Sequence, residues 1–88
     1  SATLDRSDFR DCSIRNADFR GSSLKEAVLT RANLSGANLS PLVFNNSDGS
    51  KRLQRVNASG ANLRYAVITG ANLSDCILTH ADLSYAVL

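Results

Sequence analysis

The sequence predicts an all-β solenoid, in which short extended runs turn at regular intervals and stack on one another. The first observation is a repeat of five: from position 61 to 88 a small residue recurs every fifth place, and a large aliphatic residue follows two places later. The second is that this period suits neither a helix nor a flat strand. The third is a longer repeat, since Tyr-Ala-Val-Ile at 65–68 returns as Tyr-Ala-Val-Leu at 85–88.

A period of five requires the chain to turn after each short run. At about 100° per residue, successive leucines on a helix would drift by about 140° and form no apolar stripe. Side chains on a strand alternate with period two, so an odd repeat would send every second leucine to the opposite face. Within one run, the small residue and the leucine share the inner side of an extended tripeptide. The other two residues then form a corner.

The outward residues suggest how many repeats make one coil. A coil of four repeats would place Tyr65 directly beneath Tyr85 and Val67 beneath Val87, at the observed spacing of 20. Stacked coils of this kind pair as parallel strands about 4.8 Å apart.

Several segments carry a family resemblance. Ala-Asp-Phe-Arg-Gly at 17–21, Ala-Asn-Leu-Ser-Gly at 32–36 and Ala-Asn-Leu-Ser-Asp at 71–75 resemble the A(D/N)LXX motif of the pentapeptide repeat family. The resemblance covers nearly the whole chain except 45–60. It implies a right-handed, quadrilateral parallel β-helix of about four coils, with the large residue at the centre of each side. It implies little about function.

We expect one domain over 1–88, with regular repeats at 2–46 and 61–88 and an irregular segment at 45–60. In the first block, the expected central residues are Leu4, Phe9, Ile14, Phe19, Leu24, Leu29, Leu34, Leu39 and Phe44. Leu42 is expected at a small inner position, as an exception. Asp and Asn at the outward position have short side chains that can bond to the neighbouring backbone.

The segment 45–60 has two interpretations. Clustered Asn, Ser, Asp and Gly at 45–50 indicate a turn or loop, and residues 27–35 match 66–74 at a spacing of 39. We therefore expect an irregular third coil with Leu53 and Ala58 at inner positions, Val56 at the small inner site, and a bulge around 45–51. The alternative makes all of 45–60 an excursion, which would put Val28 and Val67 on different sides.

Composition limits the class of function. Ten Lys and Arg against eight Asp and Glu give a net charge of +2, with the signs interspersed. This balance argues against a polyanionic rod and against a strongly basic nucleic-acid binder. No run of 18 apolar residues and no signal-peptide pattern are present, so we expect a soluble protein without membrane insertion, in an undetermined compartment. The start at Ser1 rather than Met suggests a trimmed chain.

The sequence offers little chemistry for catalysis. Cys12 and Cys76 occupy small inner positions about three coils apart, roughly 14 Å, which is beyond disulfide reach and indicates packing residues. His80 is expected at a surface turn and has no partners at zinc-site spacing. No Ser-His-Asp arrangement and no glycine-rich phosphate loop can be identified. We expect no enzyme activity, no metal and no cofactor.

The candidate surfaces for a partner are therefore few. Lys51, Arg52 and Arg55 form the one concentrated basic group and lie near the irregular segment; loops on rigid scaffolds often carry recognition. Tyr65 and Tyr85 form a second candidate. The alternative interpretations are a solvated loop and a surface ladder of stacked rings.

These observations predict a non-catalytic structural or protein-interaction module with an unidentified protein partner. Some pentapeptide repeat proteins imitate DNA and act on DNA gyrase, a type II topoisomerase, but that resemblance implies an anionic rod and the charge here is +2. Binding of an anionic partner through the basic loop is a further alternative. An exposed end of a solenoid also invites pairing with another edge, so Leu88 and the two tyrosines motivate a homodimer through the C-terminal coil.

Overall fold

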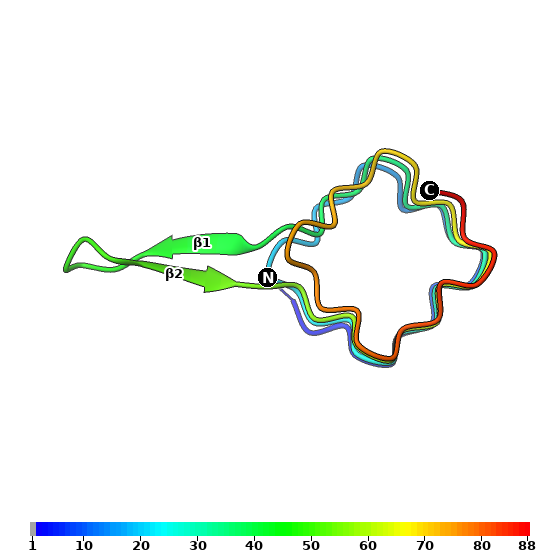
Figure 1. Cartoon of the computed structure of the whole chain (residues 1–88), viewed down its shortest axis with the longest axis horizontal. Helices are drawn as coiled ribbons and strands as arrows, with labels where there is room; N and C mark the ends of the chain where they lie inside the picture. The colour runs from blue at the N-terminus through cyan, green and yellow to red at the C-terminus, as the bar shows by residue number, and fades with distance from the viewer. Residues whose placement is uncertain (1) are drawn as a thin grey trace.

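The computed structural model describes residues 2–88, and within them the chain forms strands, bridges and turns but no helix. Two regular strands, β1 (Leu42–Asn45) and β2 (Lys51–Gln54), pair as an antiparallel hairpin. The rest of the chain winds into a stack of four-cornered turns, and the hairpin projects from one side of it (Figure 1). We call this stack the body and residues 42–55 the arm. The predicted all-β solenoid is confirmed.

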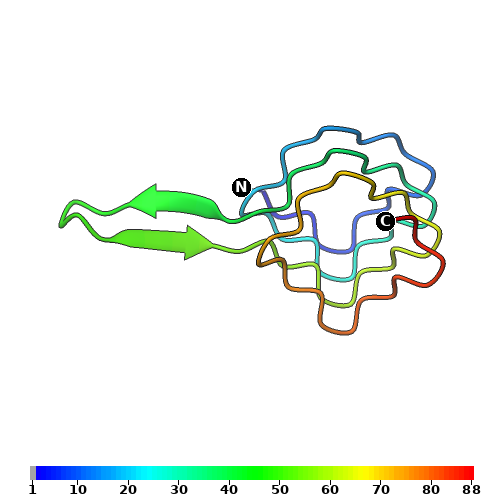
Figure 2. The same cartoon turned by 45° about the horizontal axis from the view of Figure 1, so that its top comes forward.

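Parallel bridges hold the turns of the body together in columns. Thr3 pairs with Ser23, Ser23 with Asn57, and Asn57 with Ile77. The other columns are Asp8–Val28–Asn62–Asp82, Ser13–Asn33–Val67–Val87 and Asp18–Asn38–Asn72. The sequence numbers of paired residues differ by 20, except across the arm, where they differ by 34. The arm is therefore an insertion of 42–55 between two stacked turns, as Figure 2 shows from an oblique angle.

Each corner of the body is built by a left-handed residue and a short turn. Gly21 and Gly36 have φ of +67° and +70°, as glycine allows without steric cost. Among residues 2–88, nine residues other than glycine also have positive φ, and Tyr65 and Tyr85 at +60° each are two of them. The outward Asn or Asp supports the turn: the Asn33 side-chain oxygen accepts hydrogen bonds from the backbone N–H of Ser35 at 3.0 Å and from its hydroxyl at 2.6 Å. The predicted local bonding of these short polar side chains is confirmed.

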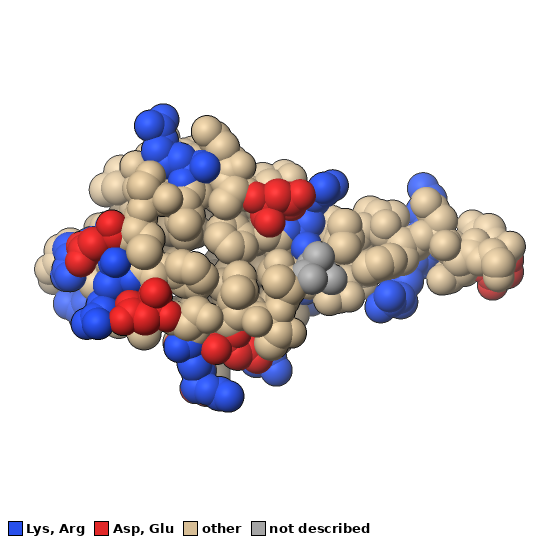
Figure 3. Space-filling view, turned by 180° about the vertical axis from the view of Figure 1, so that it is seen from behind, with Lys and Arg blue, Asp and Glu red and all other residues tan. Residues whose placement is uncertain are grey.

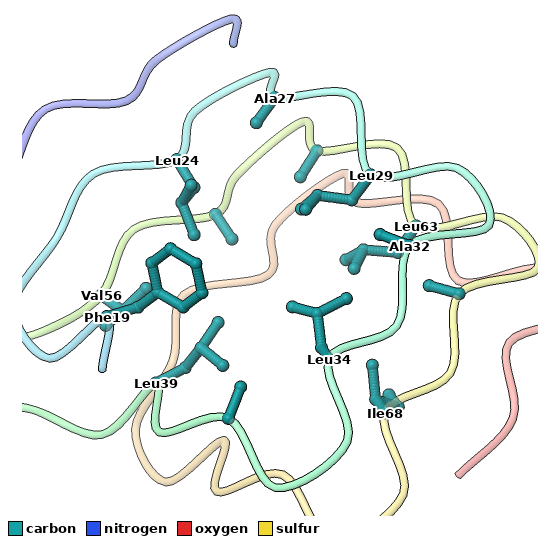
Figure 4. Packing of buried hydrophobic residues seen from close by; sticks show 14 residues of the cluster. Phe19, Leu24, Ala27, Leu29, Ala32, Leu34, Leu39, Val56, Leu63 and Ile68 are labelled. Carbon is teal, nitrogen blue, oxygen red and sulfur yellow. The ribbon is translucent and has the colours of Figure 1, made fainter. Parts of the chain in front are cut away.

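The two inner positions of every repeat fill the interior of the body. Leu24, Leu29 and Leu34 are at most 1% exposed, and the small residues between them, such as Ala27 and Ala32, are fully buried (Figure 4). Each such leucine contributes roughly 1.5–3 kcal/mol by leaving water. Burial decreases toward the last repeats, where the inner residues Leu73, Leu78 and Leu83 are half-buried against the same core.

The course of the chain between 40 and 56 differs from the preferred interpretation of the sequence. Val28 pairs with Asn62 and Val67 with Asn33, so the two valines lie on different sides, as the alternative interpretation required. Leu53 was expected inside an irregular coil, but it lies in β2 and is 57% exposed.

Leu42 and Phe44 were also expected at inner positions of the body, and this was wrong because both belong to β1. Val56 and Ala58 do occupy the predicted inner positions, with exposures of 0% and 1%. The excursion is thus an arm of 42–55, which begins earlier and ends earlier than the expected irregular segment 45–60.

Proline explains why the chain leaves the body where it does. The corners before the arm use left-handed residues at every fifth position, and Arg31 (φ +58°) and Gly36 (φ +70°) are two of them. The next position in this series is Pro41, whose ring holds φ near −65°. A left-handed corner cannot form there, so the chain continues outward into β1.

The arm approaches the body closely at one glycine. A Cβ atom on Gly21 would lie 2.7 Å from the Cβ of Leu42, so only glycine leaves room for the first residue of β1. The arm gives the molecule its length, 44 Å against 22 and 17 Å in the other two directions.

Candidate functional site

The arm is a two-stranded ribbon closed by a polar turn. Its register pairs Leu42 with Gln54, Val43 with Leu53, Phe44 with Arg52, and Asn45 with Lys51. In the turn, Asp48 accepts hydrogen bonds from the N–H and hydroxyl of Ser50, and Gly49 has φ of +88°. The turn predicted from clustered Asn, Ser, Asp and Gly is confirmed.

The ribbon has two faces, because successive side chains of a strand point to opposite sides. One face, which we call the anchored face, carries Leu42, Phe44, Arg52 and Gln54. The other, the open face, carries Val43, Asn45, Lys51 and Leu53.

The side chains of the anchored face are engaged within the protein. The Arg52 guanidinium lies 4.4 Å from the centroid of the Phe44 ring, a cation–π contact across the two strands. Gln54 donates a hydrogen bond of 2.7 Å from Nε2 to the carbonyl oxygen of Gly21, which ties the base of the arm to the body.

The open face presents an apolar pair and a cation to solvent. Val43 and Leu53 lie opposite each other and are 48% and 57% exposed. Lys51 follows on the same face beside Asn45, and among residues 2–88 its ammonium takes part in no ion pair. The open face thus presents an exposed apolar pair next to a cation that takes part in no ion pair among the described residues.

The three predicted basic residues all lie on the arm but do not form one patch. Lys51 and Arg52 are consecutive in β2 and therefore point to opposite faces. Arg55 lies at the base of the arm, where its Nε donates a 2.7 Å hydrogen bond to the carbonyl oxygen of Asp75. In the described arm, Lys51 alone combines a charge without an ion-pair partner with a position on the open face.

The charges of the molecule are divided unevenly between arm and body. The body carries seven basic residues (Arg6, Arg10, Arg15, Arg20, Lys25, Arg31, Arg64) and seven acidic ones (Asp5, Asp8, Asp11, Asp18, Glu26, Asp75, Asp82), which cancel. The arm carries Lys51, Arg52 and Arg55 against Asp48, so the whole net charge of +2 resides there. Figure 3 shows basic side chains along the arm and an acidic group at its tip, whereas both signs intermingle over the body.

Many charges of the body are also paired with one another. Arg20 donates to the carboxylate of Asp18 at 2.9 Å, and these hydrogen bonds lower the pKa of Asp18 to about 2. Further pairs join Arg10 to Asp8 at 2.8 Å, Arg31 to Asp11 at 2.7 Å and Arg64 to Asp82 at 3.6 Å. The surface of the body is thus internally compensated, and the arm is not.

The second predicted surface, Tyr65 and Tyr85, is a stacked pair. Their ring centroids are 5.0 Å apart with planes inclined by 9°, which confirms that Tyr65 lies beneath Tyr85. The Arg64 guanidinium lies 5.9 and 5.8 Å from the two ring centroids. The rings are 49% and 70% exposed. They lie on the body and outside the arm, so the two predicted surfaces are separate.

The described residues offer no clear constellation for metal binding. No cluster of three or more His, Cys, Asp or Glu with metal-binding geometry occurs among residues 2–88. His80 is an exposed corner residue with φ of +60°. Cys12 and Cys76 are free thiols, and burial raises the pKa of the Cys76 thiol.

The interior of the described part of the chain gives no polar site either. The narrow space along the axis of the body is lined by aliphatic side chains alone, Leu24, Leu34 and Leu63 among them. The same part of the chain contains no apolar helix of the length needed to cross a bilayer.

Sequence reasoning missed the pairing of Val43 with Leu53 on one exposed face because β1 was assigned to the regular repeats. Pro41 is the signal that could have found it: a residue confined to negative φ at a corner position marks the point where the repeats stop. Once the strand is recognised, alternation places Val43 and Leu53 on one face.

Comparison with known proteins agrees with this architecture. The profile described as "Pentapeptide repeats" matches residues 2–40 and 52–88, in eight copies. The crystal structure of HetL, a pentapeptide repeat protein involved in heterocyst differentiation regulation from the cyanobacterium Nostoc sp. strain PCC 7120, is similar with a TM-score of 0.56 and 26% identity. The match covers 98% of this chain and 38% of the HetL chain, so this chain spans well under half of HetL. No match is found among curated proteins.

Proposed function

Since the chain belongs to the pentapeptide repeat family, we propose that it is a non-catalytic protein-interaction module whose body holds the arm out toward a protein partner. The observation that carries this proposal is the concentration on the arm of the net charge of +2 and of the exposed Val43–Leu53 pair, beside a body whose charges cancel. Burial of the exposed apolar pair against a partner would be favourable, and an unpaired cation beside it can form an ion pair with an acidic group of that partner.

We further infer the finer geometry of the fold from the family. The body is a right-handed, quadrilateral β-helix of about four coils, and 1–88 forms a single domain; Ser1 lies outside the described residues. The bridge spacing of 20 and the four-cornered outline in Figure 1 support this inference.

The test compares the protein with a variant that lacks the arm. In this armless variant, residues 42–55 are deleted and Pro41 is changed to Gly, so that the column spacing returns to 20 and the corner at 41 can form. A photoreactive benzoylphenylalanine at position 53 captures the partner in the native host, and the partner is then purified.

The affinity of the purified partner is measured for both proteins. We expect the armless variant to bind roughly tenfold or more weakly, since a few central contacts usually supply most of the binding energy. Lys25→Glu, a charge reversal on the body, is the matched control and should bind normally. Equal affinity for the native and armless proteins would disprove the proposed role of the arm.

Imitation of DNA against a type II topoisomerase receives no support from the charge distribution. Such a role requires an anionic rod, and here the body has no net charge and the arm is positive. A gyrase supercoiling assay checks this directly, and we expect unchanged supercoiling.

Self-association through the last turn of the body is a second proposed contact. It is supported by Tyr85 and Leu88, which are 70% and 84% exposed. Light scattering at high protein concentration tests it, and a monomeric mass at all concentrations would exclude it.

A further inference from the structure

The ribbon of the arm has two unpaired edges. Among residues 2–88 its sheet contains only β1 and β2, so each strand pairs on one side and leaves the backbone groups of its other side free. Such an edge is a template for a further strand, and peptide recognition by strand addition uses it: backbone hydrogen bonds supply affinity, and alternate side chains supply specificity.

The two edges differ in charge. β1 reads Leu-Val-Phe-Asn and carries none, whereas β2 reads Lys-Arg-Leu-Gln. Charges on an edge strand oppose pairing with a second copy of the same strand. They favour a strand of opposite charge, so β2 is the edge with a defined complementary partner.

The side chains of β2 determine which residues a neighbouring strand would meet. On the anchored face, Arg52 is stacked on Phe44 and Gln54 is bonded to Gly21, so both are already engaged. On the open face, Lys51 has no ion-pair partner among the described residues and Leu53 is 57% exposed. The added strand is therefore recognised on the open face, by a cation and an apolar group two residues apart.

We infer that the free edge of β2 binds an extended segment of a partner protein that carries an acidic residue and an apolar residue two positions apart. The acidic residue lies beside Lys51, and the apolar residue extends the row formed by Leu53 and Val43 across the open face. Directly opposed pairs of these kinds stabilise neighbouring strands. This inference rests on the proposed function and adds the chemistry of the partner.

The arrangement favours a peptide over a nucleic acid. A phosphate backbone is bound by several cations directed at one strip of surface. Here Lys51 and Arg52 point to opposite faces, and Arg55 is bonded to the body at Asp75.

A synthetic peptide tests the inference without the natural partner. The probe is acetyl-Thr-Glu-Thr-Val-Thr-Glu-Thr-amide, which presents Glu, Val and Glu on one face whether it lies parallel or antiparallel to β2. It is titrated into the ¹⁵N-labelled full chain and followed by amide chemical shifts. We expect saturable shifts at 51–54, and no saturable shifts with a peptide that is N-methylated at every residue, since neither of its edges can then donate backbone hydrogen bonds.

Variants test the two side chains. Lys51→Glu should weaken the acidic peptide roughly two- to fivefold, as expected for an exposed ion pair, and should improve binding of the same peptide with Lys in place of Glu. Leu53→Ser should weaken the binding of both peptides. The control Lys25→Glu reverses an exposed charge of the body and should leave both affinities unchanged.

Three results with the synthetic peptide would overturn the inference. They are the absence of shifts at 51–54, equal binding of the N-methylated peptide, and equal affinity of the peptide for the native protein and the armless variant. If the natural partner needs the arm but the peptide gives none of the expected shifts, strand addition is wrong and the proposed function stands. If the natural partner binds the armless variant equally well, the proposed function itself is wrong.

Discussion

Excision of the arm should leave the body folded, because the repeats on either side of it are in register. The column spacing across the arm is 34, and removal of 42–55 restores the spacing of 20 found elsewhere. With Pro41→Gly, the corner at 41 can adopt the left-handed conformation of the neighbouring corners. We expect the free energy of unfolding of this armless variant to lie within about 1 kcal/mol of the native value.

The expected change in the free energy of unfolding results from two opposing effects. The variant loses the hydrogen bonds from Gln54 to Gly21 and from Arg55 to Asp75, each 2.7 Å long and each contributing about 1 kcal/mol. It also avoids closing the loop 42–55, which costs about 2.3 kcal/mol from the (3/2)RT ln n dependence on loop length. An isolated two-stranded hairpin is itself only marginally stable, so the two effects nearly cancel.

Urea unfolding followed by far-ultraviolet circular dichroism measures the difference. The control is a deletion of 42–56, one residue longer, which removes the fully buried Val56 and leaves the spacing one residue short. It should cost about 2 kcal/mol or more. If the armless variant were destabilised as strongly as this control, the deduced register would be wrong.

Three further predictions concern the body. Leu34→Ala, at a residue 1% exposed, should cost about 2–5 kcal/mol in urea unfolding, whereas Leu88→Ala, at a residue 84% exposed, should cost less than about 0.5 kcal/mol; equal costs would contradict the placement of the core. Because the pKa of Asp18 is lowered from 3.8 to about 2, its ion pair stabilises the fold above pH 3.8 and this contribution is lost as the pH falls toward 2. Asp18→Asn should therefore reduce the change of the thermal unfolding midpoint with pH over that interval. An NMR titration that gives the Asp18 carboxylate an ordinary midpoint would argue against the pair. Gly21→Ala should lower the midpoint of thermal unfolding more than Gly49→Ala, since both have positive φ but only the first introduces a Cβ contact of 2.7 Å; an equal effect would refute the tight approach of the arm.

The body could be predicted from the sequence because its repeats share one pattern, in which a small residue is followed two places later by a large apolar one. A leucine such as Leu34, placed two residues after an alanine, has one inner position available, and the recurrence of tyrosine at a spacing of 20 indicated the stacking of Tyr65 and Tyr85. The information is local and is repeated many times, so a single irregular repeat does not obscure it.

The arm could not be placed by the same reasoning. The sequence match aligns Val28 with Val67 at a spacing of 39, whereas bridged residues across the arm are 34 apart. The two spacings differ by one repeat, so the inner positions fit both equally well. Outward valines carry little information about which column they belong to, since either neighbour satisfies the backbone bridge. The restricted φ of Pro41 removes this ambiguity, because it prevents a left-handed corner at position 41 alone and so marks where the chain leaves the body.

The candidate surface was predicted only in part. The sequence located Lys51, Arg52 and Arg55 near an irregular segment, but their directions depend on strand alternation and on the bond from Arg55 to Asp75. The apolar half of the open face was not recognised, since Leu53 had been assigned to the interior and β1 to the regular repeats.

The separation of a neutral body from a positive arm also affects how the molecule moves toward another one. Near an anionic surface, the net electrostatic force acts on the arm, whereas the larger, neutral body experiences almost none. Because this force acts away from the centre of the molecule, it produces a torque. Over the roughly 8 Å Debye length of physiological salt, this torque turns the molecule so that the hairpin faces the anionic surface before any contact has formed.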